Sequence, residues 1–483
     1  MCLKDLFTGQ KKRWPFLIIF LASFFLYFQT LFFGYTGLDD SLLDQKAEIF
    51  SNLGNIKQIL VSDAFFSDSK LYYRPILNVS YLFDAQVGKY QPFVFHLSNI
   101  LLHAISACLV FIFLRQIFKK DKLALWLSLL FAAHPALAQA IAWIPGRNDI
   151  LLLISVLASF FAARHFSKTG NIKAYFSYLV LFFIALLVKE TAVFLPAILI
   201  VYWLTIGRSD RLPRDSKVMV LLGSVVIIFM WLFLRSFALS GGSGLLLVPI
   251  FRDMPSSLLM SFKVSYQAIF PLGLGVMLVT EDTNYLYSLL VWPAFSLLIM
   301  FSQQIRKEYI LFGSAWFIIF YILPFLISSD AYFSHRLYLP LVGLLILLGE
   351  IKWVKNCDFQ GKKLIRPIII LLFFFSLTFS FSKNFSSPLV FAKSAVWSAP
   401  SSWMAQANLG VIYLNNGDLD LSIKTLSRAL SLNQQVRFVR YNLGLAYYKA
   451  GDTESAKKAW QEELVINPNY GPALSGLQAI QEK

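Results

Sequence analysis

The sequence predicts an all-α protein in which a polytopic membrane helical bundle precedes a short C-terminal helical repeat domain. The chain of 483 residues is 57% hydrophobic and only 14% charged, whereas a soluble protein carries about a quarter charged residues. Apolar runs of about 20 residues recur, and each is long enough to cross a bilayer as a helix. From residue 403 the composition becomes polar and a repeated pattern begins.

Charge and cysteine content exclude several classes of protein. The net charge is +16, but the basic residues cluster in short loops between apolar runs, which argues against a nucleic-acid partner. Cys2, Cys108 and Cys357 form no disulfide framework and have no metal-ligand spacing. The first apolar run, 14–34, is too long and too aromatic for a cleavable signal peptide, so we expect an anchor helix.

Lys and Arg favour the cytoplasmic side of short loops, so the "KKR" at 11–13 places the N-terminus inside. We expect about eleven spans, and with alternating sides the basic loops between them fall inside. The outer side then carries residues 35–91, residues 238–284 and the chain after about 383. The expected spans are 14–34, 92–114, 123–143, 149–164, 174–188, 190–206, 217–237, 285–301, 309–328, 336–350 and 366–382.

The segment 258–280 is not counted among these spans. A further span here would place the basic loop 352–366 outside, against the charge rule. Pro271, Gly273 and Gly275 fit a broken segment. We therefore expect a helix or re-entrant hairpin at the outer surface.

The tail, 399–483, contains two copies of the pattern N-L-G-x-x-Y. Gly410 and Gly444 stand 34 residues apart, which resembles the tetratricopeptide repeat, and 472–482 is expected to be a capping helix. Two repeats are few for an independent solenoid, so the tail should lean on the membrane domain. It either only stabilises the chain or offers a surface for a peptide or partner protein.

An acidic pair follows the first apolar run, in "GYTGLDDSLLDQK" at 34–46. Asp39 and Asp40 have two explanations. The pair can begin an amphipathic helix, where the helix dipole favours acids. Alternatively, one carboxylate can act as a general base on a hydroxyl acceptor at the membrane boundary.

Five further motifs occur in a fixed order: "YYRPILNVSYLFD", "FHLSNILLHA", "FAAHPALAQAIAWIPGRNDILL", "LLVKETAVFLPAIL" and "SHRLYLPLVGL". Together with the acidic pair and the repeats, they resemble the transmembrane and tetratricopeptide-repeat O-mannosyltransferases of the C-type (GT-C) glycosyltransferase superfamily. The resemblance covers about 34–345 and is reinforced by the tail. It implies that residues 1–398 form a GT-C-like transmembrane glycosyltransferase domain.

The resemblance also implies a reaction. The enzyme would transfer a sugar, mannose by family analogy, from a polyprenyl-phosphate donor to a hydroxyl, with inversion. The acceptor would be a Ser or Thr of an exported protein contacted by the repeats, or, as an alternative, a lipid or cell-envelope glycan. Asp39 and Asp40 match the family's acidic pair. Because neighbouring side chains on a helix diverge by about 100°, one of them should face the reaction, and Asp39 is preferred.

A departing lipid phosphate needs fixed cations. The candidates on the outer face are Arg74, Arg147, Lys189 and Arg336, with His335 beside the last. Glu190, Asp149 and His96 are expected to support them. Competing structural explanations are a helix-end pair between Arg147 and Asp149, snorkelling of Lys189 to water, and polar contacts between helices along the stripe of His96, Asn99 and His103.

No cofactor is expected, because Arg and Lys can neutralise a monophosphate donor without a metal. A divalent cation is left open, with Asp44, Asp63, Asp68 and Asp282 as possible ligands. The short tail favours a bacterial inner membrane, with the site and repeats in the periplasm; a eukaryotic chain would sit in the endoplasmic reticulum membrane. The alternatives are a transporter and a non-catalytic membrane scaffold that displays the repeats. Convergence of the acids and cations on one outer site would favour the enzyme.

Overall fold

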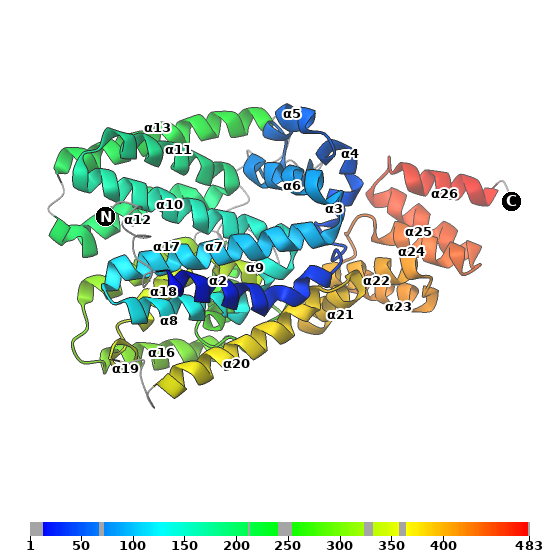
Figure 1. The fold of residues 1–483 in the computed structure, drawn as a ribbon. Helices are drawn as coiled ribbons and strands as arrows, with labels where there is room; N and C mark the ends of the chain where they lie inside the picture. The colour runs from blue at the N-terminus through cyan, green and yellow to red at the C-terminus, as the bar shows by residue number, and fades with distance from the viewer. Residues whose placement is uncertain are drawn as a thin grey trace.

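The computed structural model describes residues 13–66, 72–210, 213–239, 254–322, 332–356 and 364–481. Within these ranges the chain is helical, and Leu278 and Tyr332 form an isolated antiparallel bridge. The helices before residue 386 form a bundle, and the C-terminal helices project from one end of it (Figure 1). The predicted all-α fold with a terminal repeat domain is confirmed.

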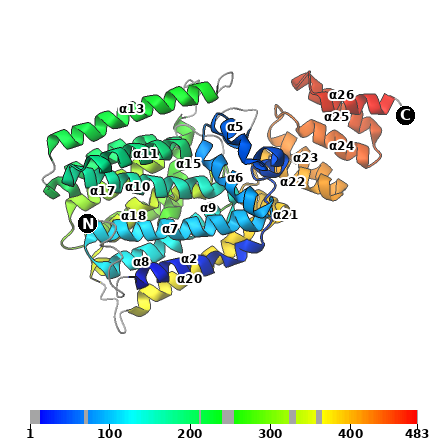
Figure 2. The same ribbon diagram turned by 45° about the horizontal axis from the view of Figure 1, so that its top comes forward.

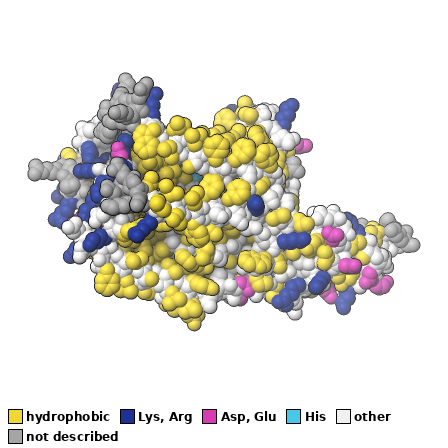
Figure 3. Space-filling view, turned by 60° about the horizontal axis from the view of Figure 1, so that its bottom comes forward, with side chains coloured by type: hydrophobic (Ala, Val, Ile, Leu, Met, Phe, Trp, Pro, Cys, Tyr) yellow, Lys and Arg dark blue, Asp and Glu magenta, His cyan; other side chains and the backbone are white. Residues whose placement is uncertain are grey.

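Two long helices form the centre of the bundle, α7 (Pro92–Phe118) and α10 (Arg147–Thr169). Each has 61% of its most apolar stretch buried, compared with 28% for α13 (Arg214–Ala238) and 17% for the helix Ile365–Phe385. A helix that is apolar all round is buried or faces lipid. Accordingly, α13 lies along the edge of the bundle (Figure 2), and apolar side chains cover much of the outer surface of the bundle (Figure 3).

The structure supports a membrane protein but not a particular number of spans. Five helices in the described residues are long and apolar enough to cross a membrane, or six if one bent pair is a single span. The predicted count of about eleven is not confirmed. Further apolar helices are shorter, namely Ile172–Val188, Glu190–Leu204 and Leu286–Met300.

The bent pair shows how a sequence break shapes the bundle. Helix α8 (Asp121–Ala132) and the segment Pro135–Ala142 meet at 51°. Pro135 cannot continue the preceding helix, and the His134 ring accepts a hydrogen bond from the Ala136 amide (3.3 Å). His134–Pro135 therefore marks a kink.

The first outer segment folds over the end of the bundle that carries the repeats (Figures 1 and 2). It consists of the short helices α3 (Ser41–Gln45), α4 (Ala47–Phe50) and α5 (Ile56–Leu60), followed by α6 (Pro75–Gly88). Its buried apolar side chains form a cluster of their own with Phe95 of α7 and Ile144. This cluster holds the acidic pair and Arg74 against the bundle.

The segment 258–280, which was predicted to be a broken helix or hairpin, contains a break. Helix α15 (Met254–Ser265) is followed by η10 (Tyr266–Ala268), and Gly273 has a φ of +66°, a conformation that glycine adopts readily. Residues 240–253 of the outer segment 238–284 lie outside the described residues. Beyond the break, the Met277 carbonyl accepts from the Ser398 hydroxyl and Asp282 from the Ser401 amide, each at 2.9 Å. The segment is therefore joined to the start of the repeats; its membrane position stays a prediction.

The repeat domain follows α21 (Pro388–Ser398) and consists of α22 (Trp403–Asn416), α23 (Leu419–Leu432), α24 (Val439–Lys449), α25 (Thr453–Ile466) and the capping helix α26 (Gly471–Gln481). A Cβ on Gly410 would lie 2.6 Å from Leu426, and one on Gly444 would lie 2.5 Å from Trp460. The repeated glycines thus allow each helix pair to close. Ala405 belongs to the main core of the bundle, so the repeats lean on the membrane domain as expected.

The remaining helices complete the bundle. They are α2 (Trp14–Tyr27), η2 (Phe28–Phe32), η3 (Leu53–Asn55), η4 (Ala64–Phe66), η5 (Pro135–Leu137), α9 (Ala138–Ala142), η6 (Ile144–Gly146), α11 (Ile172–Val188), η7 (Glu190–Phe194), α12 (Leu195–Leu204), η8 (Ile206–Asp210), α16 (Leu286–Met300), α17 (Lys307–Ile322), η12 (Ser334–Leu337), α18 (Leu341–Leu348), α19 (Lys352–Lys355), α20 (Ile365–Ser382) and η14 (Lys383–Phe385).

Candidate active site

The two carboxylates of the acidic pair have different surroundings. Asp40 is fully buried and accepts hydrogen bonds from the Thr36 amide (2.7 Å) and the Thr36 hydroxyl (3.0 Å). Asp39 is exposed. Asp40 therefore closes the loop between η2 and α3, whereas Asp39 is accessible to a substrate.

The same surroundings shift the pKa of both acids. Burial raises the pKa of Asp40 to about 6, the Thr36 hydrogen bonds oppose this, and the neighbouring Asp39 charge adds to it. Although Asp39 is exposed, the dense protein around it displaces enough water to raise its pKa as well, and the Arg74 charge opposes that rise. Asp39 thus lies within electrostatic range of a cation on the next part of the outer segment.

Arg74 connects the outer segment to the bundle. It is the last residue before α6, and Pro75 begins the helix, a position that suits proline. Its Nε and Nη2 donate to the two carboxylate oxygens of Glu190 at 3.1 and 2.5 Å, and its guanidinium lies 4.4 Å from the centre of the Tyr72 ring. Such a bidentate pair has a fixed geometry.

Lys189 lies beside Glu190 at the break between α11 and η7. Its Nζ donates to both oxygens of Asp149 at 2.8 and 2.9 Å. His335 Nε2 lies 3.8 Å from the same carboxylate. Burial, followed by the charges of Lys189, Arg336 and Arg74, holds the pKa of His335 well below its usual value. The imidazole is therefore neutral, and its contact with Asp149 is polar rather than ionic.

Two further arginines lie near the ion pairs of Arg74 and Lys189. Arg336, half-buried in η12, is within electrostatic range of Tyr72, Asp149 and Arg74. Arg235, half-buried in the last turn of α13, is within range of Glu190, Arg74 and Asp63. The sequence analysis did not select Arg235, although its place at the outer end of an expected span was a usable signal.

Arg74, Lys189, Arg235 and Arg336, together with Asp149 and Glu190, form what we call the cationic cluster. The cluster contains four cations and two carboxylates, and two further acids, Asp63 and Asp39, lie within electrostatic range of Arg235 and Arg74. Asp39 lies at the edge of the cluster, within electrostatic range of Arg74. Fixed cations beside an accessible carboxylate can bind an anion and accept a proton in the same place.

Arg147 belongs to a separate cluster. It is fully buried, with Nη2 2.5 Å from Asp84 and 2.8 Å from the Phe95 carbonyl, and Nε 2.6 Å from the Asn99 amide oxygen. Its ionic partner is Asp84, whereas Asp149, which the competing explanation paired with it, binds Lys189. Arg147 thus joins α6, α7 and α10.

The histidine stripe of α7 lies in the interior. His96 is buried, and its ring centre is 6.2 Å from that of Phe33. The His103 ring lies 2.6 Å from the Tyr338 hydroxyl and 3.1 Å from the Ala132 carbonyl. Asn99 and His103 serve as polar contacts between helices, and His96 does not reach the cationic cluster through any contact described here.

No group of three His, Cys, Asp or Glu side chains that could hold a metal occurs among the described residues. Of the acids considered as ligands, Asp63 accepts from the Tyr72 amide (2.7 Å) and Asp282 from the Ser401 amide (2.9 Å). Asp68 and the side chain of Asp44 lie outside the described parts of the chain.

Comparisons with known families match both parts of the molecule. A model described as dolichyl-phosphate-mannose-protein mannosyltransferase matches residues 82–233. Two tetratricopeptide-repeat models match 405–436 and 438–470. The first match contains Arg147, Asp149, Lys189 and Glu190 and ends two residues before Arg235.

Curated relatives agree with these matches. Protein O-mannosyl-transferase TMTC1 of Mus musculus is 31% identical over 147 residues, 28% of this chain and 16% of the relative. TMTC1 of Homo sapiens is 30% identical over 156 residues, 30% of this chain and 18% of the relative.

Protein O-mannosyl-transferase TMTC4 of Homo sapiens is 26% identical over 373 residues, 63% of this chain and 50% of the relative. The chain thus spans half or less of the length of these relatives. It is similar to the transmembrane and tetratricopeptide-repeat protein O-mannosyltransferases, the family that its motifs and repeats predicted.

Proposed function

We propose that the protein is an integral membrane glycosyltransferase that transfers mannose from a polyprenyl-phosphate donor to a Ser or Thr hydroxyl of an exported protein. The observation that carries this proposal is the position of Asp39, an accessible carboxylate electrostatically coupled to Arg74 of the cationic cluster. The named relatives are protein O-mannosyl-transferases, which supports mannose and a protein acceptor.

In the proposed reaction Asp39 removes the proton from the acceptor hydroxyl. The hydroxyl oxygen forms a bond to the anomeric carbon from the side opposite the phosphate, and the bond between that carbon and the phosphate oxygen breaks. Attack from the opposite side inverts the anomeric centre. The raised pKa of Asp39 makes it a stronger base, provided that the pH keeps it ionised.

The leaving polyprenyl phosphate carries the developing negative charge. Arg336 and Arg235 are proposed to bind it, because fixed cations stabilise such charge where it forms. Arg74 and Lys189, which pair with Glu190 and Asp149, are proposed to set the field around the phosphate, and Arg74 also acts on Asp39. The neutral His335 can donate a hydrogen bond. Arg147 is assigned to holding the helices together.

The repeats emerge at the end of the molecule that carries the acidic pair (Figure 1). This placement supports a role in presenting the acceptor polypeptide. In a bacterial inner membrane the N-terminus would be cytoplasmic and both the site and the repeats periplasmic; in a eukaryotic cell they would face the lumen of the endoplasmic reticulum.

The test is transfer of radiolabelled mannose from polyprenyl-phosphate-mannose to endogenous acceptors in membranes that contain the chain. Asp39→Asn should abolish labelling, while Glu48→Gln, which neutralises an exposed acid of the same outer segment, should leave it intact. Label that survives protease treatment and extracts with lipid would indicate a lipid or glycan acceptor. Folded wild-type protein that labels nothing would favour the scaffold.

A further inference from the structure

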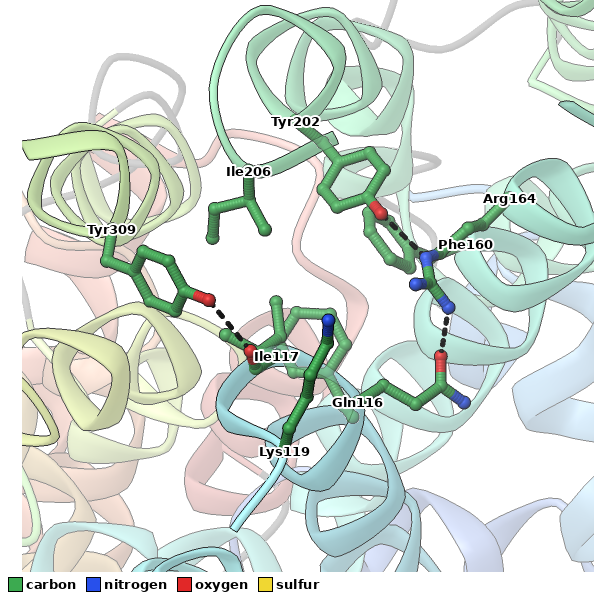
Figure 4. A pocket seen from close by; sticks show the side chains of 9 residues that line it. Gln116, Ile117, Lys119, Phe160, Arg164, Tyr202, Ile206 and Tyr309 are labelled. Carbon is green, nitrogen blue, oxygen red and sulfur yellow. Dashed lines mark hydrogen bonds between the residues drawn. The ribbon is translucent and has the colours of Figure 1, made fainter. Parts of the chain in front are cut away.

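A polar cavity lies far from the candidate active site. It is formed where α7, α10, α12 and α17 end or begin, and Arg164, Gln116, Lys119 and Tyr309 are among the residues that line it (Figure 4). Phe95, which packs in the apolar cluster of the outer segment that carries Asp39 and Arg74, and Lys119 lie at opposite ends of α7, about 35 Å apart at 1.5 Å per helical residue. Lys and Arg side chains gather at the end of the bundle opposite the repeats (Figure 3).

One wall of the cavity holds a guanidinium in a fixed position. Arg164 Nε donates to the Tyr202 hydroxyl and Nη1 donates to the Gln116 amide oxygen, both at 2.6 Å. These bonds connect α10 with α12 and with α7 (Figure 4). Arg164 is therefore preorganised, which reduces the entropy lost when an anion binds.

The facing wall supplies a second cation. Lys119 follows the last residue of α7 with a φ of +56°, and its amine points toward the cavity (Figure 4). The described residues that line the cavity include these two cations and no carboxylate. Tyr309 donates its hydroxyl to the Ile117 carbonyl at 2.9 Å, which fixes the rim between α17 and α7.

The size and rim of the cavity indicate the class of ligand. Its volume, counted as space open to the centre of a water molecule, is about 70 Å³. One water needs roughly 10–15 Å³ by this measure, so a phosphate group fits. Elsewhere on the neighbouring helices, Leu204 of α12 and Leu311 of α17 are 69% and 58% exposed, so these helices also present apolar side chains at the surface of the bundle.

We propose that this cavity binds the phosphate group of an anionic phospholipid, with Lys119 and Arg164 as its cationic contacts and the acyl chains on the apolar surface of the bundle. Basic pockets between membrane helices on the cytoplasmic side suit such headgroups. The predicted topology places this end of the bundle in the cytoplasm. A bound lipid would tie together four helices and stabilise the folded protein.

The experiment uses the full chain, purified in a non-ionic detergent. Phosphatidylglycerol, phosphatidylcholine and inorganic phosphate are titrated separately, and the melting temperature and the bound lipids, counted by native mass spectrometry, are recorded. Phosphatidylglycerol should raise the melting temperature and remain bound, whereas phosphatidylcholine should do neither. Lys119→Gln and Arg164→Gln should each need about tenfold more phosphatidylglycerol, the loss expected for one charge-assisted hydrogen bond.

Lys120→Gln is the matched control, because Lys120 is exposed, donates to the Lys355 carbonyl (3.2 Å) and does not line the cavity. Unchanged affinity in Lys119→Gln would overturn the site, as would equal binding of the two lipids. Inorganic phosphate that saturates the site and prevents lipid binding would assign it to a soluble phosphate instead. If Arg164→Gln fails to fold, Lys119→Gln decides alone. Mannose transfer is not measured, so the outcome is independent of the proposed function.

Discussion

Arg74 and Glu190 form a bidentate ion pair across 116 positions of the sequence. The pair joins the outer segment that carries Asp39 to the break between α11 and η7, where Lys189 binds Asp149. Through it, the charge that acts on Asp39 is held in the same cluster as the proposed phosphate ligands. The geometry of this one pair therefore links the proposed base to the proposed phosphate ligands.

Removing both partners of the pair should destabilise the protein less than the sum of the two single removals. The side chains are only 10% and 21% exposed, and a partner left alone in such a site costs about 3 kcal/mol. We expect Arg74→Gln and Glu190→Gln each to lower the free energy of unfolding by that order, and the double variant by less than their sum. A double-mutant cycle measures the coupling, and strict additivity would show that the pair contributes nothing.

The Arg74 charge should also set the pH dependence of transfer. Because Arg74 lowers the pKa of Asp39, Arg74→Gln should raise that pKa further. The acid limb of the activity profile should then move to higher pH. Glu190→Gln, which keeps the cation and removes its counter-charge, should move the limb to lower pH or leave it in place. Movement in the same direction in both variants would contradict the assignment of Asp39 as the base.

Ionisation of the buried Asp40 carboxyl should lower the stability of the folded protein. Its pKa is about 6 in the folded protein compared with an ordinary value of 3.8, so the folded state binds more protons between these values and stability falls as the pH rises from about 4 to 6. Two units of pKa correspond to about 3 kcal/mol. Asp40→Asn, which keeps a side-chain acceptor for Thr36, should flatten this part of the stability profile, measured by denaturation at each pH. Identical profiles for wild type and variant would refute the prediction.

Arg235 and Arg336 should matter for transfer rather than folding. Both are half-buried cations of the cationic cluster, and loss of one fixed cation at a developing charge reduces turnover by about 100-fold or more. We expect Arg235→Gln and Arg336→Gln to show this loss with little change in melting temperature. Lys383→Gln, an exposed cation over the Phe379 ring, is the control. Full activity of Arg235→Gln would show that Arg235 does not bind the donor phosphate.

The second repeat should depend on the absence of a side chain at Gly444. A Cβ there would lie 2.5 Å from Trp460 Nε1 and 3.1 Å from the Ala456 carbonyl, and overpacking of this kind costs about 1–3 kcal/mol. Gly444→Ala should make the repeats susceptible to limited proteolysis. Gly471→Ala, which has open space around its Cβ, should not. Equal resistance of the two variants would mean that the helix pair can adjust.

The sequence alone determined the all-α class, the two repeats and the position of the acidic pair, because each depends on local chemistry or on a short period. It also selected Arg74, Lys189 and Arg336 as candidate phosphate-binding cations. Tertiary structure decided that Asp39 is exposed while Asp40 is buried.

The partners of the cations were likewise decided by the fold. Arg147 pairs with Asp84, and Arg235 joins the cationic cluster. The physical reason is that membrane helices are apolar on most faces, so their hydrophobic pattern does not fix how they rotate against one another. Ion pairs between residues distant in the sequence depend on that rotation, and only the packed bundle sets it.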